Sequence, residues 1–226
     1  NLDNYVDDLK NKIKKIQNKK NFLKEKLNNT TEKNKIRKIQ KKIQNEMNRQ
    51  QLIKTYLKGK NIILTGGSLG IGKETAKSLI KKGANVLVTG RSKERLMTAF
   101  QHTESKMIEF DIGNLDNINL NAKRCIELLE NKVDVLINNA GVGVRRSIEE
   151  LNTKDFLDVF NVNVFGLSLF TKEIIPLMKA KNSGTIVNIG STASLKGYKN
   201  GSIYASSKFA VRCLTQCWQS ELRSHN

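Results

Sequence analysis

Three side chains near the C-terminal end of the sequence have the types and spacing that proton transfer requires. Tyr204 and Lys208 are four residues apart, so in a helix they lie on one face, one turn from each other. An ammonium beside a phenol favours the phenolate, which lets a tyrosine act as a general acid or base. Ser191 follows an apolar run and adds a hydroxyl. Each signal is weak alone, because such pairs are frequent on solvated helices and serine is common in turns.

A glycine-rich segment, Thr65 to Gly72, follows the first apolar run of the C-terminal part. Its spacing is GxxxGxG, which differs from the GxGxxG of the usual dinucleotide fingerprint. Glycines between a strand and a helix allow a tight turn and let the backbone approach a pyrophosphate, which binds the helix N-terminal amides. Turns need glycine in any case, so it is the place after a predicted strand that favours a nucleotide site.

The second apolar run ends in Thr89-Gly90-Arg91-Ser92, where the adenosine ribose of a dinucleotide would arrive. No carboxylate stands there to accept a bond from a ribose 2′-hydroxyl. A guanidinium such as that of Arg91 suits a 2′-phosphate, through paired charge-assisted hydrogen bonds. The alternative is an ordinary surface arginine in a turn. We therefore predict NADP (NADPH) as the cofactor in preference to NAD.

Apolar runs and helical patterns alternate from Lys60 onward and supply the elements that position these residues. Strands alternating with helices predict βαβ units, and hence an α/β, Rossmann-like, doubly wound parallel sheet. Ser191 then lies at the C-terminal edge of the fifth strand, where ligands of parallel sheets bind. The predicted strands are 61–65, 86–89, 107–110, 133–137 and 185–189, and the helical patterns pass through Ala76 and Ile80, through Ile126 and Leu129, and along 155–179 and 206–223.

Residues 1–58 have a different composition, rich in Lys, Asn, Gln and Ile and without Gly or Pro. Apolar residues recur there at steps of three and four up to Leu27, and again from Ile36 to Leu57. A narrow apolar stripe on a charged rod predicts an α-helical hairpin or a coiled coil. A solvated extension of biased composition and a membrane-surface helix are the alternatives. We place the domain boundary between 1–58 and 59–226, because a helical pattern stops there and Gly59 follows.

The formal net charge of +19 favours loose attraction to anionic partners and says nothing about the fold. Nucleic-acid binding is not expected, because the basic N-terminal part has few aromatic residues interleaved. Three cysteines without a CxxC spacing argue against a disulfide framework and a zinc site, and no metal is expected. The sequence has no run long enough to span a membrane, which predicts a cytoplasmic protein. It does not begin with Met, so an upstream targeting segment stays open.

Taken together, the motifs between residues 60 and 226 resemble those of the short-chain dehydrogenase/reductase family. The loop from Thr65 to Gly72 is similar to the family's TGxxxGxG, and residues 138–141 (Asn-Asn-Ala-Gly) are similar to its NNAG motif. Asp111-Ile112 resembles the family's adenine-contacting pair of an acidic and an apolar residue. Ser191 precedes Tyr204 by thirteen residues, as in the family. These motifs occur in the family's order and with its spacing.

The resemblance implies an NADPH-dependent oxidoreductase that reduces a small-molecule carbonyl. Tyr204 would donate a proton to the carbonyl oxygen, and Lys208 would bind the nicotinamide ribose. Ser191 would hold the carbonyl oxygen, and Asn163 would support a water-mediated proton relay. The residues expected at the cofactor are Gly66, Ser68, Leu69, Gly70, Ile71, Arg91, Asp111, Ile112, Asn138, Ala140, Gly141, Tyr204 and Lys208.

The substrate class and the extent of the fold rest on the same resemblance. The segment Tyr204–Leu214 is similar to 3-oxoacyl-thioester reductases and to 3-ketodihydrosphingosine reductases, which favours a β-keto acyl substrate. The family fold normally continues with two more strands, so we expect the C-terminal strands and most of the substrate pocket to be missing. The fragment should then bind substrate poorly.

Two alternative functions stay open at this point. One is an NAD-linked alcohol dehydrogenase of the same fold, which Arg91 argues against. The other is a non-catalytic, cofactor-binding interaction module that docks through the N-terminal helices. Members of the family often form dimers or tetramers, so a homo-oligomer is expected if the fold is complete.

Overall fold

The computed structural model describes residues 30–225, and the chain divides into two units, 1–58 and 59–226. In the first unit, α2 (Thr30–Leu57) is a single helix over the second apolar stripe. The first stripe lies outside the described residues, so the hairpin or coiled coil stays a prediction. Gly59, just past the helix, has a left-handed conformation with φ of +71°, which glycine adopts without steric cost.

The second unit is built on a sheet of five parallel strands. The strands are β1 (Asn61–Leu64), β2 (Asn85–Gly90), β3 (Lys106–Glu109), β4 (Val135–Asn138) and β5 (Thr185–Asn188). Their order across the sheet is β3-β2-β1-β4-β5. The chain therefore moves outward from β1 to β3, crosses to the other side of β1 and continues to β5. The predicted α/β fold with five parallel strands is confirmed.

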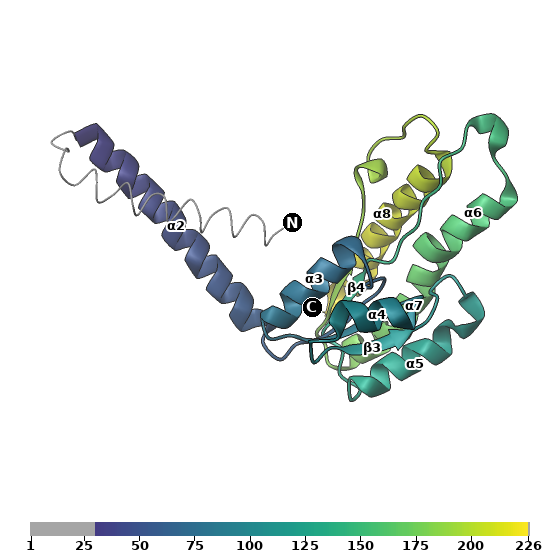
Figure 1. The fold of residues 1–226 in the computed structure, drawn as a ribbon, viewed down its shortest axis with the longest axis horizontal. Helices are drawn as coiled ribbons and strands as arrows, with labels where there is room; N and C mark the ends of the chain where they lie inside the picture. The colour runs from purple at the N-terminus through teal and green to yellow at the C-terminus, as the bar shows by residue number, and fades with distance from the viewer. Residues whose placement is uncertain (1–29, 226) are drawn as a thin grey trace. The chain divides into compact units, whose positions relative to one another are not determined.

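Helices cover both faces of this sheet (Figure 1). They are α3 (Gly70–Lys81), α4 (Lys93–Phe100), α5 (Ile118–Leu128), α6 (Thr153–Phe160), α7 (Leu167–Ala180) and α8 (Ser202–Leu222). Crossovers between parallel strands are right-handed, so α3 and α4 lie on one face, and α5 and α7 lie on the other. α5 packs against α7, and Phe170 of α7 stacks on Phe110 with ring centres 5.6 Å apart.

Three helical features differ from the sequence prediction. α4 was not predicted, because only Leu96 and its neighbours Ala99 and Phe100 give this short helix a buried face. The helical stretch predicted over 155–179 is interrupted by a π-helical turn, η3 (Asn161–Gly166). α8 begins at Ser202, four residues before the predicted start, so Tyr204 lies inside the helix.

The N-terminal edge of the sheet is held by one carboxylate. Asp134 accepts hydrogen bonds from the backbone N–H of Asn61 and from Lys181 Nζ, both at 2.8 Å, and Lys60 Nζ lies 3.9 Å away. Partial burial acts to raise the pKa of the Asp134 carboxyl, but these bonds and charges outweigh it and hold that pKa below its ordinary value. Asp134 thereby connects β1, β4 and the segment that leads into β5.

The other side of β5 has no strand partner among residues 30–225. Thr185 and Val187 are exposed on this strand, whereas the side-chain amide of Asn188 donates to Thr215 of α8 at 2.8 Å. Within the described part of the chain, no helix is both long and apolar enough to cross a membrane.

Candidate active site

The loop between β1 and α3 is joined by hydrogen bonds to the segment that follows β4. Thr65 Oγ1 accepts from the backbone N–H groups of Asn139 (3.1 Å) and Ala140 (3.2 Å). The Asn139 side-chain amide donates back to the carbonyl oxygens of Thr65 (3.0 Å) and Gly66 (2.9 Å). Gly66 has a φ of +69°, and a Cβ at this position would lie 2.6 Å from Ala140 Cα. Any side chain here would therefore push the two segments apart.

These two segments form one wall of a cleft of about 350 Å³. The cleft lies at the carboxyl ends of β1, β2 and β4, where the path of the chain across the sheet reverses. Ligands of open parallel sheets bind at such a point, and the α3 N-terminus there offers amides to a pyrophosphate. The lining residues are Gly66, Ser68, Leu69, Ile71, Gly72, Thr89, Gly90, Arg91, Ser92, Arg95, Phe110, Asp111, Ile112, Asn139, Ala140, Gly141, Val142 and Val162.

The end of β2 places two guanidinium groups at this cleft. Ser92 caps α4 by accepting a hydrogen bond from the Arg95 backbone N–H at 3.2 Å. Arg95 therefore stands one turn after Arg91, and both side chains are exposed and line the cleft. The nearest acidic residue of β3, Glu109, bonds to a backbone amide at the start of α4 and does not line the cleft. This corner of the cleft fits a phosphate better than an uncharged hydroxyl pair.

Asn163 fixes the segment that follows the cleft. Its Oδ1 accepts from the Val142 N–H, and its Nδ2 donates to the Val142 carbonyl, both at 2.9 Å. The same Nδ2 donates to Ser207 Oγ of α8 at 3.0 Å. Asn163 is buried within the π-helical turn η3, and such turns are frequent at functional sites. One side chain thus ties the segment after β4 to α8.

Lys208 is buried between α8 and the end of β5. Its Nζ donates to the Ile189 carbonyl at 2.9 Å, and burial lowers the pKa of the ammonium. The same nitrogen lies 5.9 Å from the centre of the Tyr204 ring, one helical turn earlier. A Cβ at Gly143 would come 2.9 Å from that ring, so the segment after β4 runs directly against the tyrosine.

Gly141 connects the cleft to these catalytic candidates. It lines the cleft, and a Cβ there would lie 3.4 Å from Asn163 Oδ1 and 3.6 Å from Lys208 Nζ. A dinucleotide whose adenosine end lay at Arg91 could therefore extend past Gly141 toward Lys208 and Tyr204. The two groups of predicted residues therefore lie next to each other.

Ser191 belongs to a turn packed against α8. Its Oγ accepts from the Ala193 N–H at 3.1 Å, and its own N–H donates to Ser194 Oγ at 3.1 Å. This cap starts the short turn η4 (Thr192–Ser194), which packs against α8. Among the described residues no hydrogen bond joins Ser191 to Tyr204.

The structure separates the predicted cofactor residues into two sets. Asn138 is 2% exposed, donates to Thr171 and Asn188 at 2.9 Å each, and braces the sheet behind the cleft. Gly70 begins α3 and lies outside the lining, as do Tyr204 and Lys208. The other nine line the cleft: Gly66, Ser68, Leu69, Ile71, Arg91, Asp111, Ile112, Ala140 and Gly141.

Among the lining residues, the sequence reasoning missed Arg95, whereas Asn139 belongs to the 138–141 motif that it expected to line the cleft. The spacing of four between Arg91 and Arg95 was a usable signal, but only once a helix was expected there. The partners of Asn139, Thr65 and Gly66, gave no such signal, because they lie more than seventy residues earlier. No group of three or more potential metal ligands occurs within residues 30–225.

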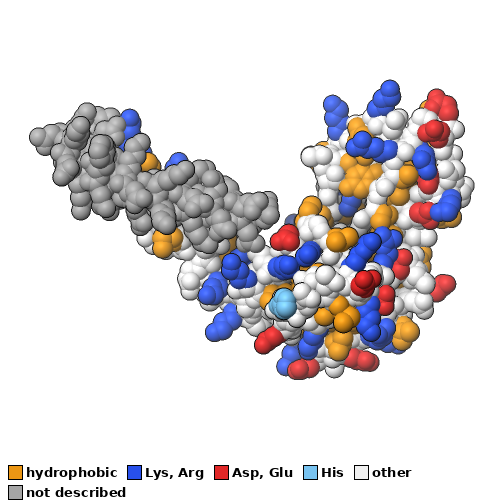
Figure 2. Space-filling view, viewed as in Figure 1, with side chains coloured by type: hydrophobic (Ala, Val, Ile, Leu, Met, Phe, Trp, Pro, Cys, Tyr) orange, Lys and Arg blue, Asp and Glu red, His pale blue; other side chains and the backbone are white. Residues whose placement is uncertain are grey.

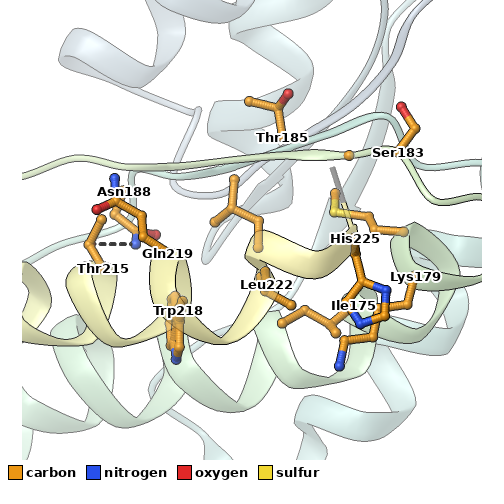
Figure 3. A pocket seen from close by; sticks show the side chains of 13 residues that line it. Ile175, Lys179, Ser183, Thr185, Asn188, Thr215, Trp218, Gln219, Leu222 and His225 are labelled. Carbon is orange, nitrogen blue, oxygen red and sulfur yellow. Dashed lines mark hydrogen bonds between the residues drawn. The ribbon is translucent and has the colours of Figure 1, made fainter.

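A second hollow of about 330 Å³ lies between α7, β5 and the C-terminal half of α8 (Figure 3). Ile175, Trp218 and Leu222 give it an apolar wall, and His225 stands near one end. None of the predicted catalytic residues lines this hollow. The first cleft, by contrast, reaches Gly141, where a Cβ would lie 3.6 Å from Lys208 Nζ.

The family whose sequence model matches this chain is that of the short chain dehydrogenases, and the match covers residues 60–226. The chain belongs to this oxidoreductase family, as the motifs predicted.

Curated relatives include ketoacyl reductases. Ketoacyl reductase HetN of Nostoc is 31% identical over 173 residues, which are 74% of this chain and 60% of that protein. The 3-oxoacyl-[acyl-carrier-protein] reductase FabG of Thermotoga maritima is 32% identical over 179 residues, 75% of this chain and 71% of that protein. The chain spans only 56–60% of the length of the first two relatives it matches.

Solved structures of the family include complexes with either nicotinamide cofactor. A metagenomic short-chain oxidoreductase in complex with NADP has 30% identity and a TM-score of 0.71, over 75% of this chain and 79% of that one. An NAD+-bound xylitol dehydrogenase has 28% identity and the same TM-score of 0.71, over 75% of this chain and 67% of that one. The fold is thus compatible with both cofactors.

Proposed function

We propose that this chain carries the nucleotide-binding and catalytic residues of an NADPH-dependent reductase of carbonyl compounds, of the β-keto acyl class. The observation that carries the proposal is the continuity between a nucleotide cleft with two arginines at its β2 end and the Tyr204–Lys208 pair. Relatives whose names specify ketoacyl reduction support the substrate class.

The cofactor preference rests on Arg91 and Arg95. Two guanidinium groups line the cleft where β2 ends, and no carboxylate from β2 joins them. A 2′-phosphate would accept several charge-assisted hydrogen bonds from them, whereas a free 2′-hydroxyl would leave two cations without a partner. The proposed cofactor is therefore NADPH.

The proton-transfer chemistry rests on Tyr204. When bound, a reduced nicotinamide supplies the hydride that the carbonyl carbon accepts. Tyr204 donates its phenolic proton to the carbonyl oxygen, so the O–H bond of the tyrosine breaks as that of the alcohol forms. The Lys208 ammonium stabilises the phenolate that results, and the Ser191 hydroxyl holds the carbonyl oxygen. Asn163 keeps the segment after β4 against the Tyr204 ring.

Titration of the full chain with NADPH and, in parallel, with NADH tests this proposal, with the fluorescence of the reduced nicotinamide as the signal. We expect clearly tighter binding of NADPH, followed by oxidation of bound NADPH when β-keto thioesters are added at concentrations high enough to offset the weak substrate binding expected of this chain. Tighter binding of NADH would favour an NAD-linked alcohol dehydrogenase. Binding of neither nucleotide would contradict the proposal and favour a non-enzymatic role.

A further inference from the structure

Two loop segments flank the catalytic tyrosine and contact each other. The segment after β4 runs against the Tyr204 ring at Gly143, and the segment from η4 leads into α8 two residues before Tyr204. The Arg146 backbone N–H donates to the Asn200 carbonyl at 3.1 Å, which joins the two segments. The two segments therefore border the tyrosine at which a substrate carbonyl would be protonated.

The two segments carry cations that have no carboxylate partner. Arg145, Lys196 and Lys199 are exposed, and no acidic side chain of the described residues forms an ion pair with any of them. The Arg145 guanidinium lies 5.9 Å from the centre of the Tyr198 ring. Tyr198 stands between Lys196 and Lys199 in the sequence. We call Arg145, Lys196 and Lys199 the basic rim.

Glu149 and Glu150 lie on the same segment as Arg145, but among the described residues no carboxylate forms an ion pair with the basic rim. Arg146, next to Arg145, does have a carboxylate partner, because its Nε donates to Asp155 at 2.6 Å. Glu150, farther along the same segment, accepts from the Ser147 backbone N–H. Lys and Arg side chains gather at the top of Figure 2, over the segment that precedes α8 in Figure 1.

Exposed apolar side chains stand on the same two segments. Ile148 is 76% exposed and Leu195 is 67% exposed, and the Tyr198 ring is 42% exposed. Tyr198 lies on Gly201, where a Cβ would come 2.5 Å from the ring, so its position is fixed by the start of α8. The approach to Tyr204 therefore offers both cations and apolar surface.

We infer that the substrate carries an anionic group, a phosphate or a carboxylate, beyond its reactive carbonyl and apolar chain, and that the basic rim binds this group. The inference rests on the proposed function, because it identifies the substrate class of that same site. Three exposed cations attract an anion by about tenfold in affinity together, and salt screens this attraction. Neutral carbonyl compounds of the same length bind correspondingly less tightly.

A matched pair of ligands tests the inference: acetoacetyl-pantetheine 4′-phosphate and the same thioester without the phosphate. Binding of each to the full chain is measured by calorimetry, with saturating NADP+, at low and at high salt. We expect the phosphorylated ligand to bind about tenfold more tightly at low salt, with the difference lost at high salt. The double variant Lys196→Gln/Lys199→Gln should lose most of that difference.

The control is Lys123→Gln/Lys132→Gln, which removes the same net charge from exposed positions on and just after α5. It should keep the preference for the phosphorylated ligand. Equal binding of the two ligands, binding of neither, or a preference that survives Lys196→Gln/Lys199→Gln would overturn the inference.

Turnover of the two thioesters separates this inference from the proposed function. Reduction of both thioesters with equal efficiency would support the reductase function and contradict the anion site. Phosphate-dependent binding without any reduction would support the anion site and contradict the reductase.

Discussion

Both halves of the site are held by hydrogen bonds between side chains and backbone, but they differ in how closely the backbone segments approach each other. In the cofactor cleft, the Thr65 and Asn139 side chains bond to backbone groups, and the segments lie so close that a Cβ at Gly66 would come 2.6 Å from Ala140 Cα. In the catalytic half, polar side chains bond to backbone groups: Asn163 to Val142, and Lys208 to Ile189. The cleft should therefore be sensitive to added atoms, whereas the catalytic half should be sensitive to removed ones.

The largest effect is expected from removal of one catalytic oxygen, by Tyr204→Phe. General acid catalysis contributes roughly 10²–10⁴-fold to a rate, so kcat should fall by about that factor. NADPH affinity should stay unchanged, because Tyr204 does not line the cleft. Steady-state rates and nucleotide fluorescence measure the two quantities. Tyr198→Phe keeps the exposed ring and serves as the control, and undiminished turnover by Tyr204→Phe would point to a binding module.

An added methyl group in the cleft should lower both the affinity for the cofactor and the stability of the fold. Gly66→Ala places a Cβ 2.6 Å from Ala140 Cα at a φ of +69°, and we expect a loss of about 1–3 kcal/mol in stability with weaker NADPH binding. Gly70→Ala is the matched control: φ is +54°, but no heavy atom lies within 4 Å of the new Cβ. Chemical unfolding and NADPH titration compare the two variants. Equal losses of stability would show that backbone strain, and not crowding by the new methyl group, causes the effect.

Removal of the Asn163 amide should loosen the catalytic half. Asn163→Ala leaves the Val142 backbone groups and Ser207 Oγ without their buried partner, which costs about 1–3 kcal/mol. At this chain length the melting temperature falls by about 2–4 °C per kcal/mol. Asn163→Asp keeps the acceptor for the Val142 N–H but buries a carboxylate against the Val142 carbonyl oxygen, so it should melt no higher than Asn163→Ala. An unchanged melting temperature for Asn163→Ala would refute this account.

Removal of one guanidinium should change the choice of cofactor without changing the fold. Arg91→Ala and Arg95→Ala should each lower the preference for NADPH over NADH by about tenfold, since both side chains are exposed and partly screened. The ratio of the two dissociation constants measures this preference. Arg124→Ala, on α5, should leave the ratio unchanged. If Arg95→Ala behaves like Arg124→Ala, Arg91 alone selects the cofactor.

The smallest effect is expected at the edge of the sheet opposite the site. Asp134→Asn should cost about 0.2–1 kcal/mol at neutral pH, because the carboxylate is only partly buried and solvent screens its ion pairs. The folded-state pKa of Asp134 is depressed, so its contribution is present above the ordinary carboxyl pKa and disappears as the pH falls through the lower, folded value. Thermal melts of Asp134→Asn and wild type should therefore converge in acid. A constant difference at all pH values would exclude ionisation as the cause.

The sequence alone determined the fold class and most of the cofactor cleft. Five apolar runs alternating with helical patterns specify a parallel sheet, because strands buried on both faces must be apolar throughout. Gly66 and Arg91 were identifiable because each stands directly after a strand, and such positions meet at one edge of the sheet. The spacing of Tyr204 and Lys208 gave their shared helix face.

Only the tertiary structure decided how these residues are held and which of their neighbours join them. Asn139 bonds to Thr65 and Gly66 across the sheet. Asn163 bonds to Val142 from a π-helical turn that the local sequence pattern did not predict. Asn138, the last residue of β4, does not line the cleft, because its side chain bonds to Thr171 of α7. Such hydrogen bonds depend on contacts between segments that are distant in the sequence, and local periodicity does not predict these contacts.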